Sequence, residues 1–348
     1  MSVLTRRDAT LALLATTLLS PTRVFSATPA VVRIGTTLSE GDAPVCIALT
    51  KGYFAEQGLD VQIVQIQTAA MMMAPLGSGQ LDVAAGAPTA GLFNAVGRGI
   101  DMKCVASESI SAPGYGVIAL LVRKDLITSG RVKSFKDFKG LTFAEVGQGT
   151  AAFVTMSEAL RRGGLTYHDV HEVFIGFPEQ IAAFTNASID ASCTIEPFAT
   201  KAIQAGVAVR FSASDVLVPN GMNGCLFFSG NFIRNQRDTA VKFMVAYIKG
   251  SRFVAGALKN GSLSGPNAGE VIDALTKYTS IKDPAIFRAI VPCAVDVNGR
   301  LDLANLRFDL AAFRGANLIE GDTTVEQVVD TSIVDAALKI VGPYRGHA

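Results

Sequence analysis

The sequence lacks the patterns by which most metal sites and common hydrolytic or nucleotide-binding sites are recognised. Its five cysteines stand far apart and form no CxxC or other metal-type pair: Cys46, Cys104, Cys193, Cys225 and Cys293. There is no G-x-S-x-G, H-E-x-x-H or P-loop motif. We therefore expect no catalytic residue, no cofactor, no metal and no essential disulfide.

The chain also lacks a strong charge of either sign. Its formal net charge is +1, and charged residues make up 18% of the composition. No run of lysine or arginine occurs, and basic residues do not alternate with aromatic ones, so nucleic acid is not an expected partner. With 348 residues and 49% hydrophobic residues, the sequence predicts a globular protein of two domains or one large one.

The first 27 residues are typical of an export signal. Arg6 and Arg7 precede an apolar run from Ala9 to Leu19, and small residues follow up to Ala27. The run is too short to cross a bilayer as a helix. The paired arginines favour the twin-arginine route, which exports folded proteins, so we expect the mature protein in the periplasm.

After this segment, strand-like and helix-like stretches alternate, which predicts an α/β protein with a largely parallel sheet. The most informative stretch is 190–206, where Asp190, a buried strand and Glu196 precede a helix that begins at Pro197. Residues 80–99 repeat this order, with a short strand and then a helix after Pro88. The repeat indicates two similar lobes that present helix starts to a shared cleft. The alternative is two ordinary strand–helix turns.

The lobes are expected to alternate along the chain. We assign 28–114 and 231–348 to lobe 1 and 115–230 to lobe 2, with crossings in the polar segment 107–116 and near residues 230–231. Nothing in the sequence indicates assembly, so we expect a monomer.

Two further motifs were weighed. Residues 147–152 match G-x-G-x-x-A between a strand and a helix, but a dinucleotide site also needs an acid at the end of the next strand, which ends in 176–178, Gly-Phe-Pro. A smaller anion at this helix start needs no such acid. His168 and His171 form an H-x-x-H pair without a third ligand in suggestive spacing, which favours a solvated loop.

Four segments carry a resemblance to a known family: 51–61 (KGYFAEQGLDV), 79–83 (GQLDV), 147–150 (GQGT) and 196–202 (EPFATKA). The chain resembles periplasmic solute-binding proteins of ABC importers, in the nitrate, sulfonate and taurine (NMT1/THI5-like) branch. The resemblance implies a type II periplasmic-binding-protein fold with a parallel-rich sheet in each lobe. It also implies that the lobes close on a small organic anion, such as a sulfonate or carboxylate, and deliver it to an ABC permease without catalysis.

Carried onto this chain, the resemblance implies a ligand site at the lobe interface. Its residues would be Leu38, Ser39, Asp42, Gly86, Ala87, Pro88, Thr89, Ser107, Tyr115, Gly147, Gln148, Gly149, Thr150, Glu196, Phe198 and Asn223. Glu196 either accepts a hydrogen bond from a ligand amine or hydroxyl, or only caps the helix after Pro197. Tyr115 and Phe198 either stack on a flat ligand or pack in the core.

The same resemblance leaves an enzymatic alternative. The family includes an enzyme of thiamine-precursor synthesis with a CCCFC motif, and this chain has no such cluster. Some relatives in the broader group are desulfinating enzymes that use one cysteine, and Cys46, just behind the first loop, is the position to which that role would fall. The alternative is therefore a THI5-like or desulfinase-like enzyme acting on a small heterocycle or a sulfinate.

Overall fold

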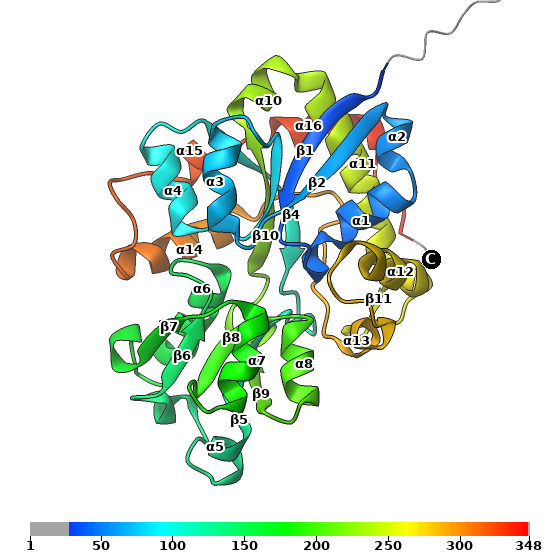
Figure 1. Cartoon of the computed structure of the whole chain (residues 1–348). Helices are drawn as coiled ribbons and strands as arrows, with labels where there is room; N and C mark the ends of the chain where they lie inside the picture. Colours follow the sequence, from blue (N-terminus) through cyan, green and yellow to red (C-terminus); the bar gives the residue numbers. More distant parts are fainter. Residues whose placement is uncertain (1–27, 347–348) are drawn as a thin grey trace, which may run out of the picture.

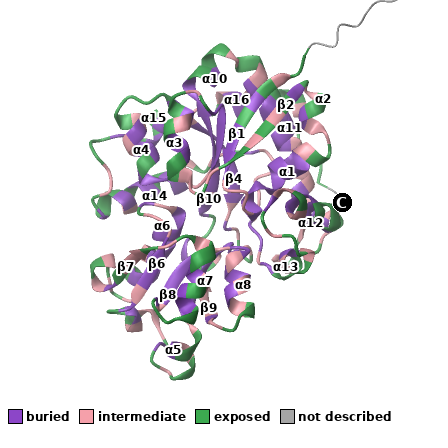
Figure 2. Cartoon of the chain, in the orientation of Figure 1, coloured by how far each residue is buried: buried purple, intermediate pink, exposed green. Residues whose placement is uncertain are grey.

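The computed structural model describes residues 28–346, which form two lobes, each built on a five-stranded sheet with helices packed on both faces (Figure 1). The predicted export signal, residues 1–27, lies outside the described residues. The expected two-lobed α/β fold is confirmed. The central strands of both sheets are buried, whereas exposed residues lie mainly on outer helices and loops (Figure 2).

The sheet of lobe 1 has the strand order β2-β1-β3-β10-β4. Its strands are β1 (Ala30–Thr36), β2 (Leu59–Gln65), β3 (Val83–Gly86), β4 (Met102–Ile110) and β10 (Met222–Ser229). β1 pairs in parallel with β2 and β3, whereas β10 is antiparallel to β3 and β4. Four strands therefore point one way, and only β10 points the other way.

The sheet of lobe 2 repeats this plan with the order β7-β6-β8-β5-β9. Its strands are β5 (Ile118–Arg123), β6 (Thr142–Glu145), β7 (His171–Phe174), β8 (Ala191–Ile195) and β9 (Ala208–Ala213). Here the single antiparallel strand is β5, which again stands fourth in the order. Because β3 and β8 both stand third, the two stretches that looked alike in the sequence occupy equivalent places.

Aspartates before β3 and β8 perform the same structural task in the two lobes. Asp82 accepts a hydrogen bond from the amide of Arg33 at 2.8 Å, and Asp190 accepts one from the amide of Thr142 at 2.9 Å. Each carboxylate thus fixes the neighbouring strand, β1 or β6. The repeat in the sequence is therefore a repeat of strand packing as well as of strand–helix order.

Helices cover both sheets, and the C-terminal part of the chain pads lobe 1 (Figure 1). Lobe 1 holds α1 (Ala43–Thr50), α2 (Tyr53–Glu56), α3 (Ala69–Gly77), α4 (Ala90–Gly97), α10 (Gly230–Asn235), α11 (Arg237–Ala255), α12 (Ala268–Tyr278), α13 (Pro284–Ala289), α14 (Leu303–Gly315), α15 (Val325–Val328), α16 (Ser332–Val341) and the small hairpin β11 (Leu258–Lys259) and β12 (Ser262–Leu263). Lobe 2 holds α5 (Lys124–Thr128), α6 (Ala151–Arg162), α7 (Phe177–Thr185), α8 (Phe198–Gln204) and α9 (Ser214–Leu217). Short 3-10 turns span Glu40–Asp42, Phe135–Phe138 and Tyr167–Asp169. None of the helices within 28–346 combines the length and the apolar character needed to cross a membrane.

The second lobe boundary differs from the prediction. β10 belongs to the sheet of lobe 1, so the chain returns at 218–221 and not near 230–231. The reason is local: Asn220 has φ 59° in the turn itself, and Cys225 to Phe228 form an apolar run buried on both faces between β3 and β4. The first crossing also begins later than expected, because β4 continues to Ile110.

Candidate functional site

The two lobes meet where two helices begin. Thr89 caps α4 and Thr150 caps α6, each accepting a first-turn amide at 3.2 Å. Across the interface, the amide of Ala90 donates to the carbonyl of Gly149 at 2.9 Å. Gly149 has φ +64°, and a Cβ there would lie 2.5 Å from that of Ala90, so only glycine fits. The starts of α4 and α6 therefore face each other across the lobe contact, whereas the repeat in the sequence pairs α4 with α8.

Three buried acids lie close together in lobe 1, and we call Glu40, Asp42 and Glu108 the carboxylate cluster. Each is at most 4% exposed. Asp42 accepts from the Ser39 amide at 2.8 Å and from the Thr36 hydroxyl. Asp42 thereby stabilises the loop between β1 and α1 by hydrogen bonds within the loop. The family resemblance implies a ligand contact for the same residue.

Burial changes the protonation of this cluster. It raises the pKa of Glu40 to about 7, although the Cys293 amide donates to Glu40 at 3.1 Å. Burial also raises the pKa of Asp42 and, helped by the charge of Asp42, holds that of Glu108 well above its usual range. The cluster therefore holds protons near neutral pH and can both accept and donate hydrogen bonds.

A β-bulge aims Glu108 toward this loop. Ser107 pairs with Cys225 and Ser109 pairs with Gly224, which leaves Glu108 as an extra residue in β4. A Cβ on Gly224 would lie 2.4 Å from Glu108 Oε2, so glycine makes room for the carboxyl group. Glu108 was not predicted, because the polar run after Ser107 is typical of a crossing loop between lobes.

Glu196 is completely buried at the end of β8 and is occupied by partners within the protein. It accepts from the Thr200 amide at 2.9 Å and forms an ion pair with Arg210. The amide of Val291, from lobe 1, approaches the same carboxylate at 3.4 Å. The helix-capping role is therefore present, and Glu196 adds a contact between the lobes. Arg210 was missed because it lies on β9, away from every motif.

The remaining predicted residues fall into three groups. Leu38 and Ser39 lie in the loop after β1, and Ala87 and Pro88 lie in the loop that leads from β3 to α4. Gly86 is the last residue of β3, and Gly147 and Gln148 lie in the equivalent loop before α6. Ser107 is buried in β4, and its Oγ has no hydrogen-bond partner among the described residues.

The third group lies at the crossings or against other side chains. Asn223 donates to Ser111 Oγ at 2.8 Å, and Tyr115 lies half-buried on the first crossing. Phe198 is half-buried and stacks on Phe177 with ring centroids 6.3 Å apart, so its ring packs against a neighbour on α7 outside the core.

Other candidate chemistry finds no support in the geometry. His168 stacks on Tyr167 at 4.1 Å, and residues 28–346 contain no group of three or more His, Cys, Asp or Glu side chains placed to hold a metal. Cys46 is buried in α1, and burial, together with the charge of Asp42, raises the pKa of its thiol well above the usual range. A thiol in this state is a poor nucleophile.

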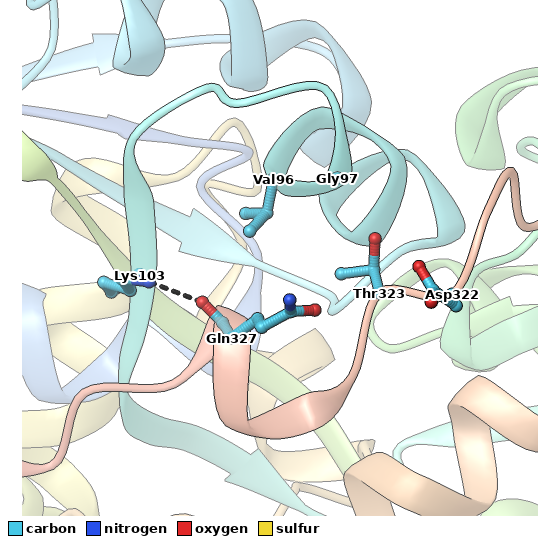
Figure 3. A pocket seen from close by; sticks show the side chains of 6 residues that line it. All are labelled: Val96, Gly97, Lys103, Asp322, Thr323 and Gln327. Atoms are coloured by element: carbon cyan, nitrogen blue, oxygen red, sulfur yellow. Dashed lines mark hydrogen bonds between the residues drawn. The ribbon is translucent and has the colours of Figure 1, made fainter.

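A separate hollow of about 300 Å³ lies on lobe 1 (Figure 3). It is lined by Val96, Gly97, Lys103, Asp322, Thr323 and Gln327. Gly97 ends the helix that Ala90 begins, so this hollow lies at the far end of α4 from the lobe contact. None of the predicted ligand residues lines this hollow, and the ammonium group of Lys103 donates a hydrogen bond to the carbonyl of Gln327.

Comparisons with known proteins agree with the fold. The family model described as NMT1/THI5 like matches residues 41–257, which is more than half of the chain, so the chain belongs to this family. One curated relative is the 4-amino-5-hydroxymethyl-2-methylpyrimidine phosphate synthase THI13 of Saccharomyces cerevisiae, 30% identical over 154 residues. That match covers 44% of this chain and 42% of the yeast protein, so the chain spans less than half of this relative.

Solved structures with the same fold are mainly binding proteins. The ligand-binding component of an ABC-type import system from Staphylococcus aureus has a TM-score of 0.74 at 14% identity, with 88% of this chain and 99% of that chain covered. The alkanesulfonate-binding protein SsuA from Xanthomonas axonopodis has 0.68 at 17% identity, covering 87% and 99%. The desulfurization enzyme DSZB has 0.61 at 13%, covering 89% and 99%. At these identities, the likeness concerns the fold alone.

Proposed function

We propose that this chain is the substrate-binding component of an ABC importer, exported to the periplasm by the twin-arginine route, which delivers its ligand to membrane permease subunits. The observation that carries the proposal is the contact between the starts of α4 and α6, where the amide of Ala90 meets the carbonyl of Gly149 at 2.9 Å. Facing helix starts in two lobes form a natural anion site when the lobes part by a hinge motion and close again.

The ligand proposed from the sequence was a small organic anion, and the carboxylate cluster narrows that class. Glu40, Asp42 and Glu108 offer hydrogen-bond acceptors in lobe 1, and a ligand that is only an anion would be repelled by any of them that is ionised. We therefore propose an anion that also carries an amino group. Its acidic end would lie at the helix starts and its amine at the cluster.

A thermal-shift series with matched small molecules tests both parts of this proposal. Taurine carries an amine and a sulfonate, ethanesulfonate lacks the amine, and ethylamine lacks the sulfonate. Taurine or an amino carboxylate should raise Tm most, because such a ligand contacts both the helix starts and the carboxylate cluster. A ligand at one hundred times its Kd adds about 2.7 kcal/mol to the free energy of unfolding. If ethanesulfonate raised Tm more than taurine, the proposed role of the carboxylate cluster would be wrong. If none of these ligands, nor nitrate or pyrimidines, changed Tm, the proposed receptor function would be wrong.

The enzymatic alternative is separated by the fate of the ligand. A receptor returns its ligand unchanged, whereas a desulfinase-like or THI5-like enzyme consumes it. Mass spectrometry of the recovered stabilising ligand should show no product, and Cys46→Ala should leave binding unaltered. If the protein consumed an aryl sulfinate or a pyrimidine, and Cys46→Ala abolished this turnover, the enzymatic alternative would be favoured. The buried, protonated thiol of Cys46 argues against that outcome.

A further inference from the structure

The far end of lobe 2 carries a group of basic side chains without acidic partners. Residues 123–139, which comprise the end of β5, α5 and the segment toward β6, contain six basic residues and two acidic ones. Their local net charge is therefore +4, in a chain whose formal net charge is +1. Arg123 pairs with Asp125 and Asp190. The other five basic residues are exposed, and none of their side chains forms an ion pair or a hydrogen bond with any residue in 28–346. We call these five residues the basic pole: Lys124, Arg131, Lys133, Lys136 and Lys139.

The segment that carries the pole is anchored by other residues. The carboxylate of Asp137 accepts hydrogen bonds from the amide of Lys133 at 3.0 Å and from that of Ser134 at 2.8 Å. Val132 and Phe138 are buried in the core. The fold of this segment therefore depends on its backbone and its apolar residues, and the basic side chains point into water without a structural task.

Surface charges on lobe 1 are arranged differently. Arg98 pairs with Glu320, and Arg307 pairs with Glu326. Opposite charges in contact cancel at a distance, whereas unpaired charges of one sign add up to a positive potential that reaches about 8 Å into physiological salt. Because like charges also repel one another, an anionic partner stabilises the pole more than it stabilises the paired surface of lobe 1.

The pole lies at the end of lobe 2 that points away from lobe 1, where α5 is seen in Figure 1. β5 runs from Ile118, next to the first crossing, to Arg123, so α5 follows at the far edge of the sheet. β6 begins at that edge with Thr142 and ends at Glu145, before the 147–150 turn that meets lobe 1. A partner bound at the pole therefore leaves the starts of α4 and α6 uncovered.

The composition of the pole indicates what kind of anionic partner fits it. Four of its five residues are lysines, whose ammonium groups are hydrated point charges, and not arginines, whose planar groups suit directional pairs. None of the large hydrophobic residues that are exposed within 28–346 falls in 123–139. Protein interfaces draw their affinity from a desolvated apolar or aromatic centre, which the pole lacks. A layer of anionic phospholipid headgroups offers diffuse negative charge and requires no such centre.

We propose that the basic pole binds the surface of an anionic phospholipid membrane by electrostatic attraction, without insertion. The contact holds lobe 2 at the membrane and leaves the lobe contact free to open. That the chain meets a membrane at all rests on the proposed function, because the proposed permease lies in one. The attraction itself can be measured without a permease and without a ligand.

Sedimentation with vesicles tests this proposal. Both lobes consist of residues within 28–346, so residues 28–348 are used, which removes the arginines of the predicted export signal. Vesicles of equal parts phosphatidylglycerol and phosphatidylcholine should sediment the protein, whereas vesicles of phosphatidylcholine alone should not. Binding should be lost when the ionic strength rises from about 0.1 M to about 1 M, because the Debye length falls from about 10 Å to about 3 Å.

Two triple variants separate the place of the charge from its amount. Replacing Lys133, Lys136 and Lys139 by Gln should weaken the partition constant about a hundredfold, which is about fivefold for each charge. The control replaces three exposed lysines of lobe 1 by Gln and changes the net charge equally, and it should alter the constant less than about twofold. These control positions are Lys242, Lys259 and Lys339. If the pole triple variant does not fold, Lys124→Gln with Arg131→Gln serves and should weaken binding about 25-fold.

Four results would overturn the proposal: equal losses in the two triple variants, equal binding to neutral vesicles, binding that persists at high salt, or no binding to the anionic vesicles. Stronger binding to polyglutamate than to vesicles of the same total charge would assign the pole to an acidic protein segment instead. The thermal shift with the ligand of the proposed receptor should be the same in the pole variant and in the wild type. A failure of the receptor function therefore leaves the vesicle result unchanged, and the two failures can be told apart.

Discussion

The units β3–α4 in lobe 1 and β8–α8 in lobe 2 share their sequence order, their place in the sheet and the aspartate that fixes the adjacent strand. They differ at the helix start. α4 begins at the neutral cap Thr89, whereas α8 begins beside the buried carboxylate of Glu196, which is neutralised by Arg210. A carboxylate already fills the anion position at α8. At the α4 start the amide of Ala90 is held by the carbonyl of Gly149, so it becomes free for an anionic ligand only when the lobes part.

Removing Arg210 should have the largest effect on stability, because its positive charge compensates the buried carboxylate of Glu196 at the start of α8. Arg210→Met leaves Glu196 buried without a countercharge, and we expect a loss of about 3–5 kcal/mol in the free energy of unfolding. Urea denaturation measures it. Arg161→Met, which removes an exposed arginine from another glutamate pair, should cost less than about 1 kcal/mol. Equal losses of unfolding free energy in Arg210→Met and Arg161→Met would contradict the proposed difference between the starts of α4 and α8.

Glu40 provides the opposite case, a buried glutamate for which no arginine partner is found among residues 28–346. Its pKa is raised to about 7, so the stability it contributes is present below the unfolded pKa of about 4.3 and is lost as the pH rises through about 7. Across that window the loss has an upper bound of about 4 kcal/mol. Glu40→Gln should flatten the profile of Tm against pH over this range, whereas an unchanged slope would show that Glu40 ionises normally.

The lobe contact is tested by Gly149→Ala. The new Cβ would lie 2.5 Å from that of Ala90, and φ is +64°, so we expect a loss of about 1–3 kcal/mol. Gly164→Ala is the matched control, since its φ is +71° and a Cβ there meets nothing within 4 Å. Affinity for the ligand selected by thermal shift should fall only in Gly149→Ala. If ligand affinity fell in both variants, the positive φ at the glycine, and not the contact with Ala90, would account for the loss of affinity.

The smallest expected effect concerns the two caps. Thr89→Ala and Thr150→Ala each remove a hydroxyl that accepts a first-turn amide at 3.2 Å, and each should cost about 0.5–2 kcal/mol in unfolding free energy. Ligand affinity, measured by calorimetry, should fall in both, because each cap orients amides at the same interface. A change in affinity in only one of them would show that the ligand uses a single helix.

Much of this arrangement could be predicted from local sequence. Asp82, Asp190, Pro88 and the 147–150 turn carry signals that depend on near neighbours, and the two α/β lobes follow from them. The place of β10 in the sheet of lobe 1 and the partner Arg210 could not be predicted, because both depend on pairing between distant segments. Glu108 was missed for a related reason: its orientation comes from a bulge opposite Gly224, which no spacing within β4 reveals.

The most direct test is a crystal structure of the protein with the amino-bearing anion that raises Tm most. The account predicts that the acidic group of the ligand lies at the starts of α4 and α6 and that its amine contacts Glu40 or Glu108. A ligand bound in the hollow beside Lys103, or one whose acidic group lies at Glu196 and the start of α8, would contradict it.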